Sequence, residues 1–210
     1  MADAASDSAR KGRLSARDVL IDAAEHLFGT IGFDGVSTRQ ILDFAGQKNQ
    51  SALQYHFGGR SGLIWAVLDA RLSAIEQSRK LLTKQLPSAG KESPEDLANL
   101  IIRPLAEFVD RDARGSAFVQ FNIQTLHRPG EGATQVIESG DYPAMKEMFD
   151  RLEAHLAHLR DEERPLRRRM IITTAIGSVA SWDATCRDNV SLEEFLPSAV
   201  AATSAIIRLS

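Results

Sequence analysis

The chain has 210 residues and a formal net charge of −3, and 43% of its residues are hydrophobic while 25% are charged. This composition is typical of a soluble globular protein whose one or two domains bury a real core. A single cysteine, Cys186, excludes a disulfide scaffold and a zinc site built from several cysteines. No apolar run reaches the roughly 18 residues of a membrane span, and residues 1–14 lack the apolar core of a secretory signal. We therefore expect a cytoplasmic protein.

Residues 15–60 have the pattern of three helices separated by glycines. Ser15 begins the first helix, which carries apolar residues at helical spacing. Ser37 begins a short second helix that Gly46 ends, and a further short run covers residues 50–56. A tight turn between two short helices behind a longer one predicts a helix-turn-helix.

The rest of the chain continues with helical patterns, and no alternation typical of strands competes with them. The next helix is long and looks like a connector between two bodies. We therefore predict an all-α fold. The expected helical ranges are 60–86, a helix that starts at Ser93 and Pro94, and then 116–127, 143–160, 166–187 and 192–209.

A specific ensemble of small, apolar and polar residues runs through the first third of the chain. Its members are Leu20, Ile21, Ala23, Ala24, Leu27, Phe28, Gly32, Phe33, Ser37, Thr38, Ile41, Ala45, Gly46, Leu53, His56, Phe57 and Leu63. This ensemble resembles the TetR family of bacterial transcriptional regulators, although no single pair in it is specific. Beyond residue 86 the resemblance is only one of helical layout. The interval from Gly46 to Leu53 is one residue longer than the commonest family spacing, which predicts a longer turn before the third helix.

A short helix fits the major groove of DNA, where its first residues reach base edges and flanking groups hold phosphates. Hydrogen-bonding side chains gather at residues 48–54. Tyr55 and His56 are candidate phosphate contacts, with sealing of the hairpin core as the alternative. Other phosphate candidates lie at the start of the second helix and of the long helix. The predicted DNA-binding residues are Thr38, Arg39, Lys48, Asn49, Gln50, Ser51, Gln54, Tyr55, His56 and Arg60.

Residues 1–14 are expected to form a flexible basic arm, because Arg10, Lys11 and Arg13 lie close together there. Two interpretations stay open for these cations. They enter a minor groove next to the recognition site, or they form a solvated tail.

One helix-turn-helix contacts too little DNA for strong selectivity, which predicts a homodimer on a palindromic operator. The resemblance implies a four-helix dimer interface built from the last two helices, where small residues allow close approach. Packing of these residues within one subunit is the alternative. The predicted dimerisation residues are Ala175, Gly177, Ala180, Ala184, Ala199, Ala202, Thr203 and Ile206.

The resemblance also implies an effector cavity in the second domain. Apolar walls with a few polar groups suit a small, mostly hydrophobic ligand. An ordinary core role is the alternative for each residue, and neither a cofactor nor a metal is expected. The candidate cavity residues are Trp65, Phe108, Phe118, Phe121, Asn122, Met145, Met148, Phe149, His155 and Trp182.

Together these patterns predict a repressor that a small effector releases from its operator by shifting the long helix. A ligand-responsive activator is the alternative within this class. The expected division is an arm at residues 1–14, a helix-turn-helix domain at 15–60, a connecting helix at 61–86 and an effector-binding and dimerisation domain at 87–210.

Two other classes compete with this prediction. A metal-dependent helical enzyme would use His155 and His158, whose spacing of three allows both rings on one helical face. The same spacing also gives the polar edge of an amphipathic helix, and no catalytic constellation or phosphate-binding glycine loop accompanies it, so we expect no enzyme. A nonspecific DNA-packaging protein is disfavoured because the second half of the chain is acidic. Its basic run at 167–169 follows acidic residues at 161–163, which favours a solvated, paired face.

Overall fold

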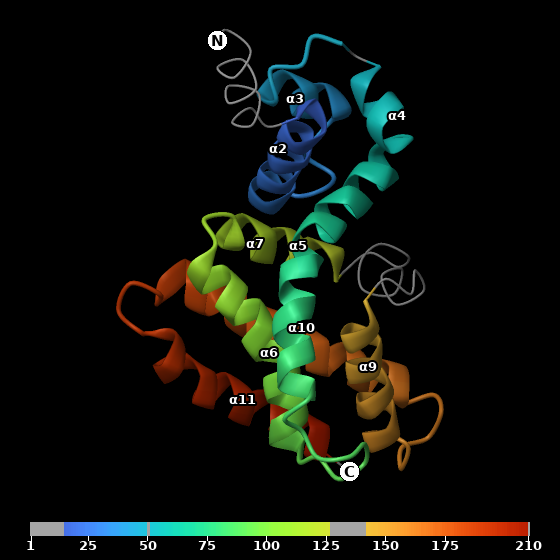
Figure 1. Cartoon of the computed structure of the whole chain (residues 1–210), viewed down its shortest axis with the longest axis vertical. Helices are drawn as coiled ribbons and strands as arrows, with labels where there is room; N and C mark the ends of the chain where they lie inside the picture. Colours follow the sequence, from blue (N-terminus) through green and yellow to red (C-terminus); the bar gives the residue numbers. More distant parts are fainter. Residues whose placement is uncertain (1–14, 50, 127–141, 210) are drawn as a thin grey trace, which may run out of the picture.

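The computed structural model describes residues 15–49, 51–126 and 142–209. Every regular element in these ranges is an α-helix, which confirms the all-α prediction (Figure 1). No helix of the described part is long and apolar enough to cross a bilayer. The helices are α2 (Ala16–Ile31), α3 (Thr38–Phe44), α4 (Ala52–Phe57), α5 (Arg60–Thr83), α6 (Pro94–Arg111), α7 (Gly115–Thr125), α9 (Pro143–His155), α10 (Arg164–Thr185) and α11 (Leu192–Arg208).

The helices are arranged in two bodies that α5 joins. Helices α2, α3 and α4 lie together at one end of the molecule, and α5 runs from them along the second body (Figure 1). Helix α7 lies between the two bodies, packed against α2, while α6, α10 and α11 pack against one another farther along the molecule.

Local side-chain chemistry explains where several helices begin. The Ser37 hydroxyl accepts a hydrogen bond from the Gln40 backbone N–H, and the side-chain Oε1 of Gln40 accepts one from the Ser37 backbone N–H at 2.8 Å. The same reciprocal pairing starts α6 at Ser93 and α11 at Ser191. Each pairing satisfies N–H groups that have no partner within the helix, so these starts depend on the neighbouring sequence alone.

Helix α2 crosses α7 at very short distance. A Cβ added to Gly29 would lie 2.8 Å from the backbone oxygen of Ala117, so only glycine allows this approach. Next to the crossing, the Phe28 ring packs on Phe33 at 4.7 Å, and the Phe33 ring contacts Phe121 of α7 at 5.5 Å. The core of the first body is therefore continuous with that of the second.

A buried ion pair fastens α2 to α5. The Arg71 guanidinium lies 2.7 Å from the Glu25 carboxylate and 2.5 Å from that of Asp22. The side chains of Arg71 and Glu25 are 10% and 2% exposed. Burial raises the pKa of Glu25, whereas the hydrogen bond from Arg71 acts in the opposite direction. Each charge therefore offsets the cost of burying the other, and removal of one partner leaves a buried charge without a counter-ion.

We predict that Arg71→Ala lowers the free energy of unfolding by about 3 to 5 kcal/mol, because it leaves Glu25 buried without its cation. Urea denaturation measures this loss. Lys146→Ala is the matched control, because its ion pair with Asp150 is more than half exposed and its loss should change stability by less than about 0.5 kcal/mol. Equal effects of the two substitutions would contradict the role of the buried pair.

Candidate nucleic-acid interface and internal cavity

Helix α4 is short, and its two sides differ in burial. Ala52 and Leu53 are buried against the first body, whereas Tyr55 is 84% exposed. The Asn49 side-chain oxygen accepts a hydrogen bond from the Ser51 backbone N–H at 2.9 Å and orders the turn before the helix. Between α3, which ends at Phe44, and α4, which begins at Ala52, the structure describes residues 45–49 and 51.

The structure places most of the predicted DNA-contacting side chains on the surface of this hairpin. The high exposure of Tyr55 argues against a role in sealing the hairpin core. His56 is half-buried, and its ring centre lies 5.0 Å from that of Tyr55. Gln50 lies outside the described residues, as do Arg10, Lys11 and Arg13 of the arm. The exposed members of the set are Arg39, Lys48, Asn49, Ser51, Gln54 and Tyr55.

A hollow of about 490 Å³ lies between α3 and the turn that follows it. Thr38 and Arg39 line it from the start of α3, and Lys48 lines it from the turn. Arg39 is 81% exposed, and its ion pair with Asp43 is long at 3.8 Å. The fold therefore brings predicted DNA-binding side chains from two different elements to one surface.

Arg60 requires a correction. Its guanidinium donates to the backbone oxygen of Val36 at 2.5 Å and to that of Phe33. The same group lies over the Phe28 ring at 4.7 Å. Arg60 thus points into the first body and fastens the start of α5 to the loop before α3, so we remove it from the phosphate contacts. Arg17 is an exposed cation nearby, 5.4 Å from the Phe57 ring.

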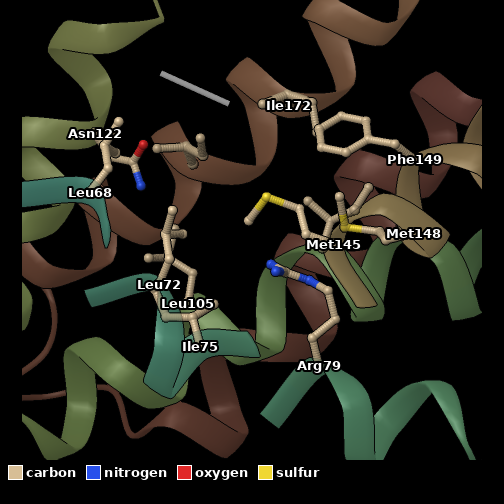
Figure 2. A pocket seen from close by; sticks show the side chains of 12 residues that line it. Leu68, Leu72, Ile75, Arg79, Leu105, Asn122, Met145, Met148, Phe149 and Ile172 are labelled. Carbon is tan, nitrogen blue, oxygen red and sulfur yellow. The ribbon is translucent and has the colours of Figure 1, made fainter. Parts of the chain in front are cut away.

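A cavity of about 70 Å³ lies in the second body among five helices (Figure 2). Four predicted cavity residues line it: Asn122, Met145, Met148 and Phe149. The contribution of α5 was not predicted, because its apolar residues were assigned to a helix that connects two bodies. The complete lining is Leu68, Leu72, Ile75, Arg79, Ile101, Leu105, Asn122, Met145, Met148, Phe149, Ile172 and Ile176.

The other predicted cavity residues do not line this cavity. Phe108, Phe118 and Phe121 form an aromatic core, with ring centres 5.6 and 6.2 Å apart in that order. The Trp182 indole N–H donates to the Val190 backbone oxygen at 2.7 Å, and its ring stacks on Phe195. These residues therefore have the core role that was the alternative interpretation.

Trp65 and His155 also lie away from the cavity. Trp65 lines a surface hollow near α4 together with His56 and Arg17. His155 is the last residue of α9, and the His158 ring nitrogen lies 3.0 Å from its backbone oxygen. Because α9 ends at His155 instead of residue 160, the two rings do not share a helical face, which corrects that premise of the enzyme alternative. The described residues contain no group of three metal-ligating side chains.

Arg79 is the charged group of the cavity wall. It is 4% exposed, and its Nε donates to the Leu100 backbone oxygen at 3.4 Å. Its Nη1 finds no hydrogen-bond partner among the described residues and lies 3.9 Å from the Glu76 carboxylate. Burial lowers the pKa of Arg79 to about 10, so the group remains a cation at neutral pH.

The predicted dimerisation residues fall into two groups. Ala175, Ala180, Ala199 and Thr203 are buried within the subunit, which agrees with the alternative interpretation for them. Ala184 and Ala202 are exposed, and Gly177 and Ile206 are half-buried. A Cβ added to Gly177 meets nothing within 4 Å, so this part of α10 is open. Exposed apolar residues adjoin this surface at Leu166, Met170 and Leu209.

Comparisons with known proteins agree with this fold. Residues 20–67 match the family described as bacterial regulatory proteins, tetR family. No curated protein sequence matches the chain. A tetR family transcription regulator from Shewanella sp. PV-4 superposes with a TM-score of 0.58 at 15% identity, over 91% of this chain and 97% of that chain. Residues 20–67 therefore match the tetR family model, and the chain as a whole has the fold of the TetR family regulator on which it superposes.

Two further structures resemble the chain more distantly. FadR of Thermus thermophilus in complex with lauroyl-CoA has a TM-score of 0.48 at 15% identity, over 92% of this chain and 95% of that chain. The multidrug binding protein EbrR in complex with imidazole has a TM-score of 0.45 at 20% identity, over 94% and 98%. At these scores the similarity carries no argument about ligands.

We predict that Arg60→Ala lowers the free energy of unfolding by about 2 to 4 kcal/mol, because two charge-assisted hydrogen bonds and a cation–π contact are lost together. Arg39→Ala is the matched control, with an exposed side chain and an expected change below about 0.5 kcal/mol. Thermal or urea denaturation distinguishes the two. If the Arg60 variant were as stable as the Arg39 variant, the structural role of Arg60 would be refuted and Arg60 would again be a candidate phosphate contact.

Proposed function

We propose that the chain is a homodimeric, sequence-specific transcriptional regulator, a repressor that leaves a palindromic operator when a small, mostly hydrophobic effector enters the cavity. One observation carries this proposal. Helix α5 begins three residues after α4 ends and supplies Leu68, Leu72, Ile75 and Arg79 to the cavity wall. One continuous helix therefore connects the candidate reading surface with the candidate effector site.

The reading surface would contact DNA through the turn before α4 and through the exposed side of α4 itself. Asn49, Ser51 and Gln54 offer hydrogen bonds to base edges, and Lys48 to guanine or phosphate. Arg39, Thr38 and Tyr55 would hold phosphates on either side. Ala52 and Leu53 fix the orientation of α4 because their burial directs the opposite side outward.

Effector entry would act through the way α5 is attached to the first body. Arg60 and Arg71 fasten α5 to the loop before α3 and to α2, so a displacement of α5 at the cavity moves the helix-turn-helix with it. In a dimer this motion alters the separation of two reading heads that must match half-sites about 34 to 36 Å apart, or a multiple of that distance. A coupling free energy of about 1 to 3 kcal/mol is sufficient for control of DNA affinity.

We keep the division into an arm, a helix-turn-helix domain, a connecting helix and an effector-binding and dimerisation domain as part of this proposal. A DNA-binding regulator of a bacterial family works in the cytoplasm, where we place the chain. Activation remains the alternative direction of control. No observation on the described residues favours the metal-dependent enzyme, because His155 and His158 lie at the end of α9 and beyond it.

The DNA-binding proposal predicts that selection from a random DNA pool yields a palindromic site. For this site, log affinity should fall linearly with log salt concentration, and Arg39→Ala should reduce the slope by about 0.9, the value for one phosphate contact. Gln54→Ala should change base preference at one position per half-site. Lys146→Ala, an exposed cation of the second body, is the control and should leave binding unchanged. Uniform protection of DNA in footprinting, or affinity indifferent to salt, would refute the proposal.

The dimer proposal predicts that Gly177→Glu converts the protein to a monomer at micromolar concentration, because it places a charge on the open face of α10. The subunit itself should fold normally, since a side chain at this position meets nothing within 4 Å. Sedimentation velocity measures the oligomeric state. Ala154→Glu, on the exposed side of α9, is the matched control and should remain dimeric. A wild-type monomer would exclude this interface.

A further inference from the structure

Three arginines are buried in the described part of the chain, and one of them lacks a close carboxylate. Arg71 and Arg151 each lie 2.7 Å from a carboxylate oxygen. Arg79 differs, because its ion pair with Glu76 spans 3.9 Å and its Nη1 has no hydrogen-bond partner among the described residues. A buried cation without a hydrogen-bonded counter-ion is costly, so the position of Arg79 requires an explanation.

The carboxylate of Glu76 is engaged elsewhere. Its two oxygens accept hydrogen bonds from the backbone N–H groups of Ala144, at 2.5 Å, and Met145, at 3.0 Å. These amides belong to the first turn of α9, where a negative charge is favourable. Glu76 therefore attaches α9 to α5 and is satisfied by this contact. The unpartnered nitrogen of Arg79 remains available for another acceptor.

Arg79 lies at the cavity wall. Figure 2 shows its guanidinium pointing into the space between Leu72 of α5 and Met145 of α9. Every other lining residue is apolar except Asn122, which lies on the opposite side of the cavity in this view. The burial that lowers the pKa of Arg79 is what a bound anion would compensate. An apolar chamber with one buried cation at its wall is suited to a ligand with one anionic end.

Building on the effector role proposed above, we propose that the cavity binds an apolar monocarboxylate whose carboxylate pairs with Arg79 and whose hydrocarbon part lies among the apolar side chains. The planar guanidinium matches a carboxylate in geometry. A phosphate monoester carries more charge and needs more donors than this single cation supplies. The buried Arg79 guanidinium is thus the group that selects a carboxylate over other classes of ligand.

The size of the cavity indicates how such a ligand is accommodated. Its volume of about 70 Å³ is less than half of the ~150 Å³ that admits benzene in an engineered protein cavity. The hydrocarbon part must therefore displace wall side chains. Met145 and Met148 are unbranched and flexible, and both belong to the start of α9, where Glu76 holds the backbone N–H of Met145 itself. Ligand entry would press α9 and α5 apart at the point where the two are joined.

Calorimetric titration of the full chain with three matched pairs tests the proposal: octanoate with 1-octanol, decanoate with 1-decanol, and 4-phenylbutanoate with 4-phenyl-1-butanol. At least one carboxylate should bind at least tenfold more tightly than its alcohol. Equal binding within every pair, or no binding of any carboxylate, overturns the proposal.

Arg79→Met removes the cation while keeping an unbranched apolar side chain. In this variant the preference should disappear or reverse, with the alcohol binding at least as tightly as the carboxylate. Arg103→Met is the matched control, because Arg103 lies on α6 outside the cavity lining and should leave the preference intact. A carboxylate preference that survives in Arg79→Met also overturns the proposal.

A second measurement uses the wild-type chain and does not depend on the folding of a variant. In ¹⁵N-labelled protein, the Arg79 Nε–H resonance should shift on addition of the tightest-binding carboxylate and not on addition of its alcohol. An unshifted resonance in saturated protein contradicts the assignment. Neither experiment contains DNA, so the two proposals fail separately. Absence of operator binding would refute the regulatory role and leave the carboxylate site unaffected. Absence of carboxylate binding together with intact operator binding would refute only the carboxylate site.

Discussion

The attachment of α5 to the first body is the constraint on which the other features depend. Arg60 holds the start of this helix to two backbone oxygens of the loop before α3, and Arg71 holds it to Glu25 and Asp22 about three turns later. Arg71 is buried and Arg60 is half-buried, and loss of a partner is costly for a charged group that is shielded from water. The first body therefore follows α5 as a unit. If α5 were free to hinge at Arg60, a change in the cavity would not be transmitted to α4.

A second connection between the bodies is made by packing instead of charge. Gly29 lets α2 approach the backbone of α7, and the rings of Phe28 and Phe33 reach Phe121 across this crossing. Dense packing of this kind transmits displacement because an interior has few voids in which to absorb it. Asn122, the neighbour of Phe121 on α7, lines the cavity. Both α5 and α7 thus have one side at the cavity and another at the first body.

Much of the fold is predictable from local sequence because local chemistry determines it. Ser37, Ser93 and Ser191 begin helices through contacts with residues three positions later, and glycines interrupt the first domain where the structure turns. The exposed side of α4 is predictable as well, since polar side chains at residues 48–54 have little reason to face a core.

The residue roles that were predicted wrongly have a common physical cause. Each is determined by contacts with residues that are distant in the sequence. Arg60 was expected on the surface, yet its acceptors lie 24 and 27 positions earlier in the chain. Phe118 and Phe121 were assigned to the cavity, but α7 is apolar on most sides, so its pattern does not show which side faces which neighbour. Arg79 interrupts the apolar stripe of Leu72 and Ile75, and this signal was available in the sequence as a charged residue at a core position.

The central claim is that the cavity and the reading surface are coupled through α5. The most direct test is the operator affinity of the full chain, measured by fluorescence anisotropy at fixed salt, without ligand and with a ligand that calorimetry shows to occupy the cavity. The coupling predicts that occupancy weakens operator binding by about 5- to 150-fold. Identical affinities for the free and the fully occupied protein would contradict it.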